Sequence, residues 1–377
     1  EDNLSGIRVV KSFANEDIEN EKFKVGNDAF LDAKKNSYHY MGGYNSGLTA
    51  FNTMINLIVI VSGGIMITRN AVSITDLLTF LLYINIFTDP VKTLIDFTEQ
   101  FQNGYSGYER FQQILQLEPE IRDREDAIEL KNVKGNISFD NVSFRYNDNA
   151  HRVLKHINLD INAGEYVALV GSSGAGKSTL CNLIPRFYDV SSGSIKINGK
   201  DIRDYDVGVL REKFGAVFQN DIIFEDSVSE NIKLGRNITD ENMKKAAKAS
   251  CIDSHISQMD EGYDSFLAIR GNNLSGGQKQ RMLISRAIAG NPEILVLDDS
   301  SSALDYKTDA AIRKNIDEMG KNTTTIIVAQ RVSSVLDCDK IIVIDEGRIA
   351  ACGNHDKLLK TCAIYARISS LQSGITQ

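Results

Sequence analysis

The chain has 377 residues, of which 42% are hydrophobic and 24% are charged, a composition that suits folded domains with buried cores. Its net charge of −8 argues against a protein that binds nucleic acid through attraction to phosphate. Five cysteines without a C-x-x-C pair indicate reduced, structural thiols in a cytosolic compartment. The first residue is Glu1 and not Met, so we expect the chain to begin inside a longer protein.

The first 38 residues are polar and rich in charges of both signs, except for a short amphipathic piece at residues 4–13. That piece is too short to cross a membrane. Residues 48–68 carry no charge, and as a helix they would be about 31 Å long, which matches a hydrocarbon core of about 30 Å. A buried helix of a soluble protein is the alternative, but 21 uncharged residues is long for one. We therefore expect a membrane helix at about 39–69.

A second apolar run, residues 77–95, follows a short polar gap and predicts a membrane helix at about 74–104. Asp89, Lys92 and Asp96 share one face of this helix by their i, i+3, i+7 spacing. Charges at this depth either face a water-filled cavity or a partner helix, or they form an ion pair near the inner interface, and the spacing leaves both readings open. The two helices would form a hairpin with both ends on one side of the membrane.

Single residues add detail to this hairpin. Pro90 predicts a kink in the second helix. Asn52, Asn56 and the pair Gly63 and Gly64 predict that one face of the first helix packs on other helices.

Residues 116–136 are a polar linker, and from residue 137 to the end strands alternate with helices. Several strands are apolar throughout, as strands buried on both faces must be. Asn198 and Gly199 predict a hairpin turn. Residues 137–377 are therefore expected to form an α/β P-loop ATPase domain with a helical subdomain. The expected strands are 137–146, 167–170, 195–197, 216–218, 294–298, 324–328 and 340–345.

A phosphate-binding loop follows the strand at 167–170. The pattern G-x-x-x-x-G-K-[ST] is the Walker A motif, in which glycines turn the backbone tightly and N–H groups face a polyphosphate. Lys177 can reach the β- and γ-phosphates of ATP, and the Ser178 hydroxyl can ligate Mg²⁺. A chance match in an ordinary strand-to-helix turn is the alternative. The motif comprises Gly171, Ser172, Ser173, Gly174, Ala175, Gly176, Lys177, Ser178 and Thr179.

Two further motifs lie downstream. Residues 274–278 place a serine and two glycines before a helix pattern, which makes a second anion site. Asp298 ends an apolar strand in the Walker B arrangement and would hold Mg²⁺. Because one loop already binds the phosphates, a second site predicts ATP sandwiched between two chains. The second anion site comprises Leu274, Ser275, Gly276, Gly277 and Gln278.

With these motifs in this order, the chain resembles the ABC transporter family, and its exporters with six membrane helices per half in particular. Residues 274–278 resemble the family signature. The resemblance implies that Tyr146 stacks on adenine and that Gln219 touches Mg²⁺ and couples to the membrane domain. It further implies a D-loop across the dimer interface at Ser302, Ala303, Leu304 and Asp305.

The resemblance covers essentially the whole chain. It implies that residues 1–115 are the C-terminal part of the membrane domain, with the first four helices missing. It makes residues 4–14 the coupling helix between the fourth and fifth membrane helices. The hairpin would be helices five and six, and Asn85 and Asp89 would be candidate substrate contacts.

The chain departs from the family pattern at three positions. Asp299 stands where the family usually has the catalytic glutamate, and its side chain is one methylene shorter. A displacement of a catalytic group by about 1 Å can lower the reaction rate about a hundredfold. Gln330 replaces the switch histidine and cannot become cationic. Ile269 stands where a glutamate is expected before the signature. We therefore expect a site with Lys177, Asp299 and Gln330 as catalytic residues that binds ATP but hydrolyses it poorly.

The resulting expectation is the degenerate half of a heterodimeric exporter in the cell membrane, with its ATPase domain in the cytoplasm. Its partners would be a second exporter half with intact glutamate and histidine, membrane lipid and an unidentified substrate, and no nucleic acid. Three alternatives remain. They are a homodimeric exporter with slow but competent hydrolysis, a soluble ABC ATPase of DNA repair or translation, and an ATP-sensing regulatory subunit.

Overall fold

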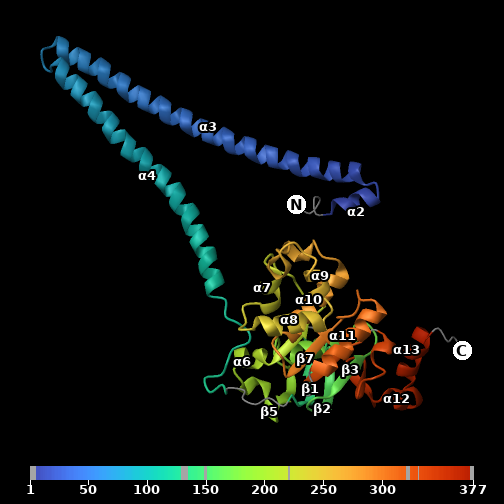
Figure 1. Cartoon of the computed structure of the whole chain (residues 1–377). Helices are drawn as coiled ribbons and strands as arrows, with labels where there is room; N and C mark the ends of the chain where they lie inside the picture. Colours follow the sequence, from blue (N-terminus) through green and yellow to red (C-terminus); the bar gives the residue numbers. More distant parts are fainter. Residues whose placement is uncertain are drawn as a thin grey trace. The chain divides into compact units, whose positions relative to one another are not determined.

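The computed structural model describes residues 6–128, 135–147, 151–219, 221–319, 323–329 and 331–373. The chain divides into two compact units, residues 1–118 and residues 119–377 (Figure 1). The first unit is helical, and the second combines strands with helices. Both parts of the predicted fold class are therefore confirmed.

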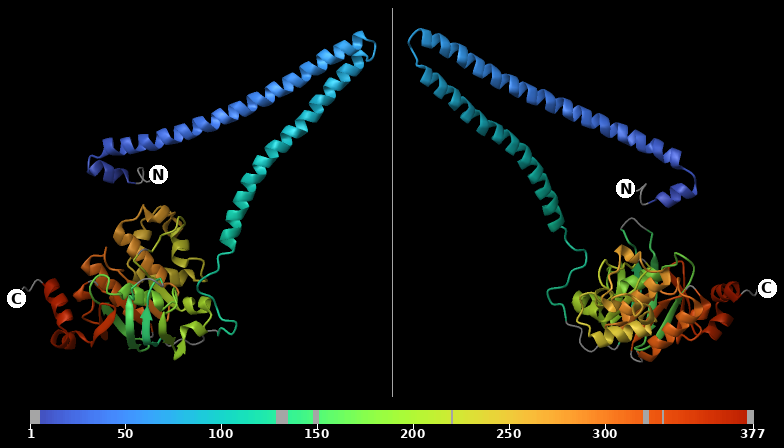
Figure 2. Two further views of the ribbon diagram at one scale, coloured as in Figure 1. Left: turned by 180° about the vertical axis from the view of Figure 1, so that it is seen from behind. Right: turned by 45° about the horizontal axis from the view of Figure 1, so that its top comes forward.

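The first unit consists of α2 (Ile7–Ser12), α3 (Glu16–Thr68) and α4 (Ile74–Leu115). A capping box begins α4, in which Asp76 N donates to Ser73 Oγ at 3.2 Å and Ser73 N donates to the Asp76 carboxylate at 3.0 Å. The two long helices meet at a tight turn and diverge from it (Figure 2). Next to that turn, a Cβ added to Gly63 would lie 2.4 Å from Leu77 Cδ1. Gly63 therefore allows the close approach of α3 and α4.

Both long helices extend beyond the predicted membrane segments. The helix expected at 39–69 begins at Glu16, and the helix expected at 74–104 continues to Leu115. Residues 16–38 carry several Glu and Lys and residues 105–115 carry Glu and Gln, which propagate a helix even where no apolar stripe marks it. Pro90 lies inside α4, which continues through it without a break.

The apolar side chains of the first unit are exposed. No residue of α3 is buried, and Phe51 and Leu57 are each 59% exposed. An apolar surface of this extent needs lipid or other helices as neighbours. Among the described residues, α3 is the one helix long and apolar enough to cross a membrane, and the apolar part of α4 is Ile74–Ile84. The side chains of Asn85, Asp89, Lys92 and Asp96, on the charged part of α4, lie outside the described residues.

Two sheets form the second unit. A six-stranded sheet has the order β10-β9-β3-β8-β7-β6, and a four-stranded antiparallel sheet has the order β2-β1-β4-β5. Its strands are β1 (Ile137–Phe144), β2 (Leu154–Ile161), β3 (Tyr166–Val170), β4 (Ser192–Ile197), β5 (Lys200–Asp201), β6 (Phe214–Val217), β7 (Ile294–Asp298), β8 (Thr324–Val328), β9 (Lys340–Asp345) and β10 (Arg348–Gly353).

Two hydrophobic clusters fill this unit. One contains side chains of both sheets together with α5 and α6, and the other joins the far face of the larger sheet to α7–α13. Because β3, β7 and β8 are parallel, their carboxyl ends lie at one edge of the sheet. The helices are α5 (Lys177–Leu183), α6 (Val207–Glu212), α7 (Val228–Lys233), α8 (Asp240–Ala249), α9 (Asp253–Ile256), α10 (Gly276–Ile288), α11 (Tyr306–Met319), α12 (His355–Thr361) and α13 (Ala363–Ser373).

The predicted strands are present, and β7, β8 and β9 have the predicted bounds. The prediction missed β2, β5 and β10, because their polar and apolar residues alternate or because they are short. The predicted hairpin joins β4 to β5, with φ values of 52° at Asn198 and 80° at Gly199. Two successive positive φ angles are the geometry of a type I′ turn.

Candidate functional site

The phosphate-binding loop connects β3, in the middle of the larger sheet, to the first residue of α5. Gly176 caps the helix with a φ of 105°, a conformation that side chains rarely adopt. Gly171 lies so close to β9 that an added Cβ would be 2.1 Å from the Ile344 carbonyl oxygen. The loop therefore needs glycine at both ends to turn back over the sheet edge and present its backbone N–H groups.

Lys177 lies against this loop. Its Nζ donates to the carbonyl oxygens of Gly171 at 2.9 Å and Ser172 at 2.7 Å. Partial burial lowers the pKa of Lys177, and the negative charge of Asp298 opposes that shift. The ammonium is thus positioned by two backbone dipoles at the mouth of the loop, within a cavity that also contains carboxylates.

Asp298 is the last residue of β7 and is 3% exposed. Burial raises the pKa of Asp298, as does the neighbouring charge of Asp299. A hydrogen bond from the Ser178 side chain and the charge of Lys177 oppose this rise. The carboxylate is therefore held close to the first turn of α5, at a cost in desolvation that a cation would offset.

Asp299 follows directly and has an unusual backbone. Its φ is 56°, in the left-handed region, where a residue other than glycine costs about 1–2 kcal/mol. Burial raises the pKa of Asp299, and a hydrogen bond with the side chain of Ser302 opposes that rise. The left-handed backbone turns the chain sharply where β7 ends, next to the phosphate-binding loop.

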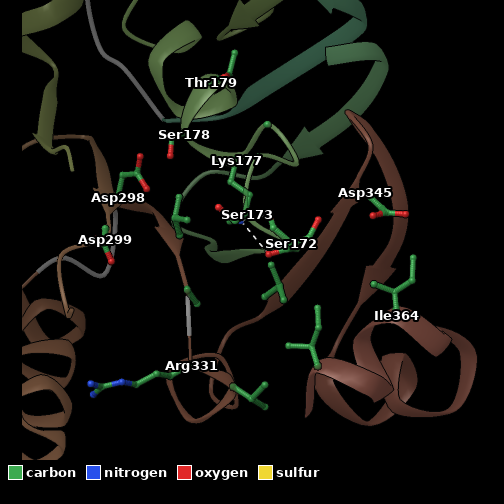
Figure 3. Close-up of a pocket in the computed structure, with 18 of the residues that line it drawn as sticks. Ser172, Ser173, Lys177, Ser178, Thr179, Asp298, Asp299, Arg331, Asp345 and Ile364 are labelled. Atoms are coloured by element: carbon green, nitrogen blue, oxygen red, sulfur yellow. Dashed lines mark hydrogen bonds between the residues drawn. The ribbon is translucent and has the colours of Figure 1, made fainter. Parts of the chain in front are cut away.

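One cavity of about 960 Å³ brings most of the predicted site residues together. In Figure 3, Asp298 and Asp299 lie on one side of the phosphate-binding loop, and Asp345 and Ile364 lie on the other. The predicted residues that line it are Gly171, Ser172, Ser173, Gly174, Gly176, Lys177, Ser178, Thr179, Gln219, Asp298 and Asp299.

Tyr146 lies beside this cavity. Its hydroxyl is 3.0 Å from Thr179 Oγ1, in the first turn of α5. Its ring meets Phe144 and Tyr188 edge-on, with centroids 4.9 Å and 5.2 Å away. The ring is 45% exposed, so part of its surface is open to a ligand.

The predicted second anion site lies outside this cavity. Ser275 begins α10 with a capping box, in which Gln278 N donates to Ser275 Oγ at 3.3 Å and Ser275 N donates to Gln278 Oε1 at 2.7 Å. The predicted D-loop, residues 302–305, packs against this helix start, with Ala303 next to Gly276 and Gly277. The structure therefore brings residues 274–278 and 302–305 together, apart from the phosphate-binding loop. Gln330 lies outside the described residues.

Sequence reasoning missed several residues that line the cavity. Arg331 is one of them, and its guanidinium lies 4.8 Å from the ring centroid of Tyr306 and donates to the Leu304 carbonyl at 3.4 Å. Nothing in the sequence pattern marks α13 as part of the cavity wall, because its residues are far from every motif. The other missed lining residues are Val153, Val170, Val328, Ala329, Val332, Asp345, Ile364, Arg367, Ile368 and Leu371.

The donor groups at the sheet edge suit magnesium. Ser178, Gln219 and Asp298 supply a hydroxyl, an amide oxygen and one carboxylate to the same cavity. Mg²⁺ prefers oxygen ligands and is usually held by one or two carboxylates together with phosphates and water. Among the described residues, no group of three His, Cys, Asp or Glu side chains could hold a metal by itself. The residues therefore fit a Mg²⁺ ion that arrives with a nucleotide.

Comparison with known proteins agrees with this geometry. Residues 154–302 match the family model of the ABC transporter, and residues 1–91 match that of the ABC transporter transmembrane region. The chain is 38% identical over 375 residues to the uncharacterized ABC transporter ATP-binding protein YwjA of Bacillus subtilis, covering 99% of the chain and 65% of YwjA. It is 39% identical over 379 residues to a putative multidrug export ATP-binding/permease protein of Staphylococcus aureus, covering 98% of the chain and 64% of that protein.

A solved structure is also similar. The structure of a bacterial Atm1-family ABC exporter with ATP bound superposes with a TM-score of 0.87 at 31% sequence identity. The superposition covers 100% of this chain and 66% of that chain. The chain thus spans about two thirds of the length of the proteins it matches.

Proposed function

Because the chain belongs to the ABC transporter family, as an exporter half-transporter that joins a membrane domain to an ATPase domain, we propose that it drives export of a substrate with ATP. The family assignment places the chain in a membrane, with its nucleotide-binding domain in the cytoplasm. The observation that carries the proposal is the joint cavity of Lys177, Ser178, Gln219 and Asp298 at one sheet edge.

ATP is bound along this edge from base to γ-phosphate. The exposed ring of Tyr146 stacks on adenine, held edge-on by Phe144 and Tyr188. The backbone of the loop at 171–176 surrounds the phosphates, and the start of α5 points its N–H groups at them. Lys177 exchanges its two carbonyl partners for phosphate oxygens, to which it donates with its full positive charge.

Ser178, Gln219 and Asp298 would hold Mg²⁺ when ATP is bound. The ion would neutralise charge that develops on the phosphate oxygens during transfer. The side chain of Asp298 is suited to this task because its ionised form is destabilised by burial until a cation arrives. Asp299 lies next to it and orients the attacking water. It accepts the water's proton as the water oxygen bonds to the γ-phosphorus, while the bond to the bridging oxygen breaks and ADP leaves with the electron pair.

ATP is sandwiched between this chain and a second ABC subunit. The cavity of one chain is completed by residues 274–278 of the other, which lie outside their own chain's cavity. In the same way, the D-loop reaches across the dimer interface with Ser302, Ala303, Leu304 and Asp305. Closure of the two nucleotide-binding domains is transmitted through Gln219 and residues 4–14 to the membrane helices, which switch the cavity from inward to outward facing.

We propose that this chain hydrolyses ATP weakly at its own site and is half of a heterodimer. Asp299 is one methylene shorter than the usual glutamate, and Gln330 has no imidazole to become cationic. The second anion site at 274–278 is intact, so it can complete the ATP site of the partner subunit normally. The partner, with glutamate and histidine in these places, would perform most of the hydrolysis.

The test is purification of the full-length protein alone and together with its partner subunit, each in lipid nanodiscs. The heterodimer should hydrolyse ATP, with labelled nucleotide retained at the site of Lys177 while the partner site turns over. Vigorous ATPase activity from a homodimer would contradict the heterodimer proposal.

A homodimeric exporter with slow hydrolysis is the second candidate. The observation in its favour is that the Asp299 carboxyl lines the cavity directly beside Asp298. In this case, hydrolysis by the protein alone would be slow but coupled to transport. Because the Staphylococcus aureus relative is named a putative multidrug export protein, apolar organic compounds are the first substrate class to test in either case.

A further inference from the structure

Gln280 connects the helix of the second anion site to the end of the Walker B strand. It lies in the first turns of α10, two residues beyond Gln278, and outside the ATP cavity. Its Nε2 donates to the Asp299 carbonyl oxygen at 2.9 Å and to Ser302 Oγ at 2.9 Å. Its Oε1 accepts from the Ala303 backbone N–H at 2.8 Å.

Only a carboxamide of this length can make the three contacts. The Ala303 N–H can only donate and the Asp299 carbonyl can only accept, so the amide of Gln280 has a single suitable orientation. A glutamate at this position would have no hydrogen to donate at neutral pH, and a methionine would make none of the three hydrogen bonds. The contacts therefore depend on the chemistry of glutamine and not on its volume.

The segment that Gln280 holds has a strained backbone. Asp299 has a φ of 56°, and such strained residues persist only where surrounding contacts determine them. Ser302 Oγ also lies 3.3 Å from the Asp299 carbonyl oxygen, and a hydrogen bond joins the Ser302 side chain to the Asp299 carboxyl. Gln280 therefore fixes both the backbone of Asp299 and the hydroxyl that contacts its carboxylate.

The same contacts extend to the second anion site. A Cβ on Gly277 would lie 3.1 Å from the Ala303 carbonyl oxygen, and a Cβ on Gly276 would lie 3.4 Å from Ala303 Cβ. The start of α10 is thus packed directly on the segment that Gln280 bonds. A shift of residues 274–278 must move this segment and, through Gln280, the peptide of Asp299.

We propose that Gln280 is a positioning residue that couples the two ATP sites of the transporter. It fixes Asp299, which belongs to this chain's site, relative to the second anion site at 274–278, which closes on the partner's ATP. This inference rests on the proposed function, because it requires ATP at both sites. Gln280 acts through Asp299 and Ser302, and it does not touch the nucleotide.

The test compares Gln280→Met with the wild type in the full-length transporter in nanodiscs, assembled with a partner subunit that has lost its own catalytic glutamate, so that only this chain's site hydrolyses ATP. Single-turnover hydrolysis of radiolabelled ATP gives the rate constant, and titration with labelled ATP gives the affinity. We expect the rate constant at this chain's site to fall about tenfold, since a misplacement of 1 Å costs up to about a hundredfold. The ATP affinity should change less than about twofold, because the cavity is untouched.

Two controls separate positioning from folding. Gln258→Met makes the same substitution at an exposed glutamine of the helical subdomain and should alter neither quantity. Ser302→Ala removes a partner of Gln280, so the double variant should be about as slow as the slower single variant, because both changes disrupt one network.

The outcomes distinguish failure of the proposed role of Gln280 from failure of the proposed function. An unchanged hydrolysis rate in Gln280→Met, or fully additive effects with Ser302→Ala, would overturn the role of Gln280. Equal losses of affinity and rate would overturn it as well, because they indicate a damaged cavity. Absence of ATP binding by the wild type would instead refute the proposed function itself.

Discussion

The hydroxyls of Tyr146 and Thr179 lie 3.0 Å apart, which ties the aromatic residue after β1 to the first turn of α5. The helix start that binds phosphate and the ring proposed to bind adenine are thereby held at a set separation. Two other aromatic rings meet Tyr146 edge-on, so its orientation does not depend on the ligand. This arrangement prepares the site for a nucleotide before one arrives.

Tyr146→Ala should weaken ATP binding while leaving hydrolysis of bound ATP almost unchanged. Stacking of a base on an aromatic side chain contributes about 1–3 kcal/mol, which corresponds to a rise in Kd of about 5- to 150-fold. Tyr146→Phe keeps the ring and loses a single hydrogen bond, so its Kd should rise by less than about tenfold. Fluorescent ATP titration measures both, and an unchanged Kd in Tyr146→Ala would exclude stacking.

Gly171→Ala should abolish tight ATP binding. The added methyl would lie 2.1 Å from the Ile344 carbonyl, which belongs to a strand and cannot move aside. The loop must shift instead, and its backbone N–H groups would then no longer meet the phosphates. Gly199→Ala is the matched control, because its methyl meets open space and only the φ of 80° is strained. That variant should lose about 1–2 kcal/mol of stability and keep its ATP affinity.

Asp298→Asn should stabilise the nucleotide-free protein and remove its response to Mg²⁺ and ATP. Burial raises the pKa of Asp298, so the folded state holds the proton more strongly than the unfolded chain. The resulting stability is present at low pH and is lost as pH rises through the raised pKa. The asparagine remains neutral, so its advantage in Tm should grow with pH.

Thermal denaturation at several pH values, with and without Mg²⁺ and ATP, measures this effect. Even the loss of a group that supports a metal ligand costs about 10- to 100-fold in affinity, so loss of the ligand itself should cost at least as much. A lower Tm for Asp298→Asn than for the wild type at neutral pH would contradict this account.

The second unit was largely predictable because its buried strands are uniformly apolar and its loop motif has a fixed spacing. The bounds of β7, β8 and β9 follow from such runs. In contrast, β2 carries polar residues on its exposed face and shows no continuous run. The N-terminal part of α3 was missed because a helix without an apolar stripe has no periodicity to detect.

The candidate site likewise contains residues that the sequence predicts and residues that it does not. Lys177 and Asp298 were predictable from local patterns that end a strand or begin a helix. Gln280 and Arg331 were not, because their importance lies in contacts with Asp299 and Tyr306, 19 and 25 residues away in the chain. Contacts over such separations depend on how strands pair and helices pack, which no single-sequence pattern records.

Replacing Asp299 by glutamate and Gln330 by histidine should restore hydrolysis at this chain's site. The added methylene extends the carboxylate toward the γ-phosphate, and the imidazole adds a group that can become cationic. We expect the rate of ATP hydrolysis at this site to rise by about 10- to 100-fold in the double variant, with little change in ATP affinity.

The measurement is single-turnover hydrolysis in a heterodimer whose partner subunit has lost its own catalytic glutamate, so that only this site contributes. Asp299→Asn provides the opposite control and should slow the site further. A double variant no faster than the wild type would mean that Asp299 already suffices, as in a homodimeric exporter. The strained backbone of Asp299 makes this a demanding test, because a longer side chain helps only if Gln280 and Ser302 still hold the peptide in place.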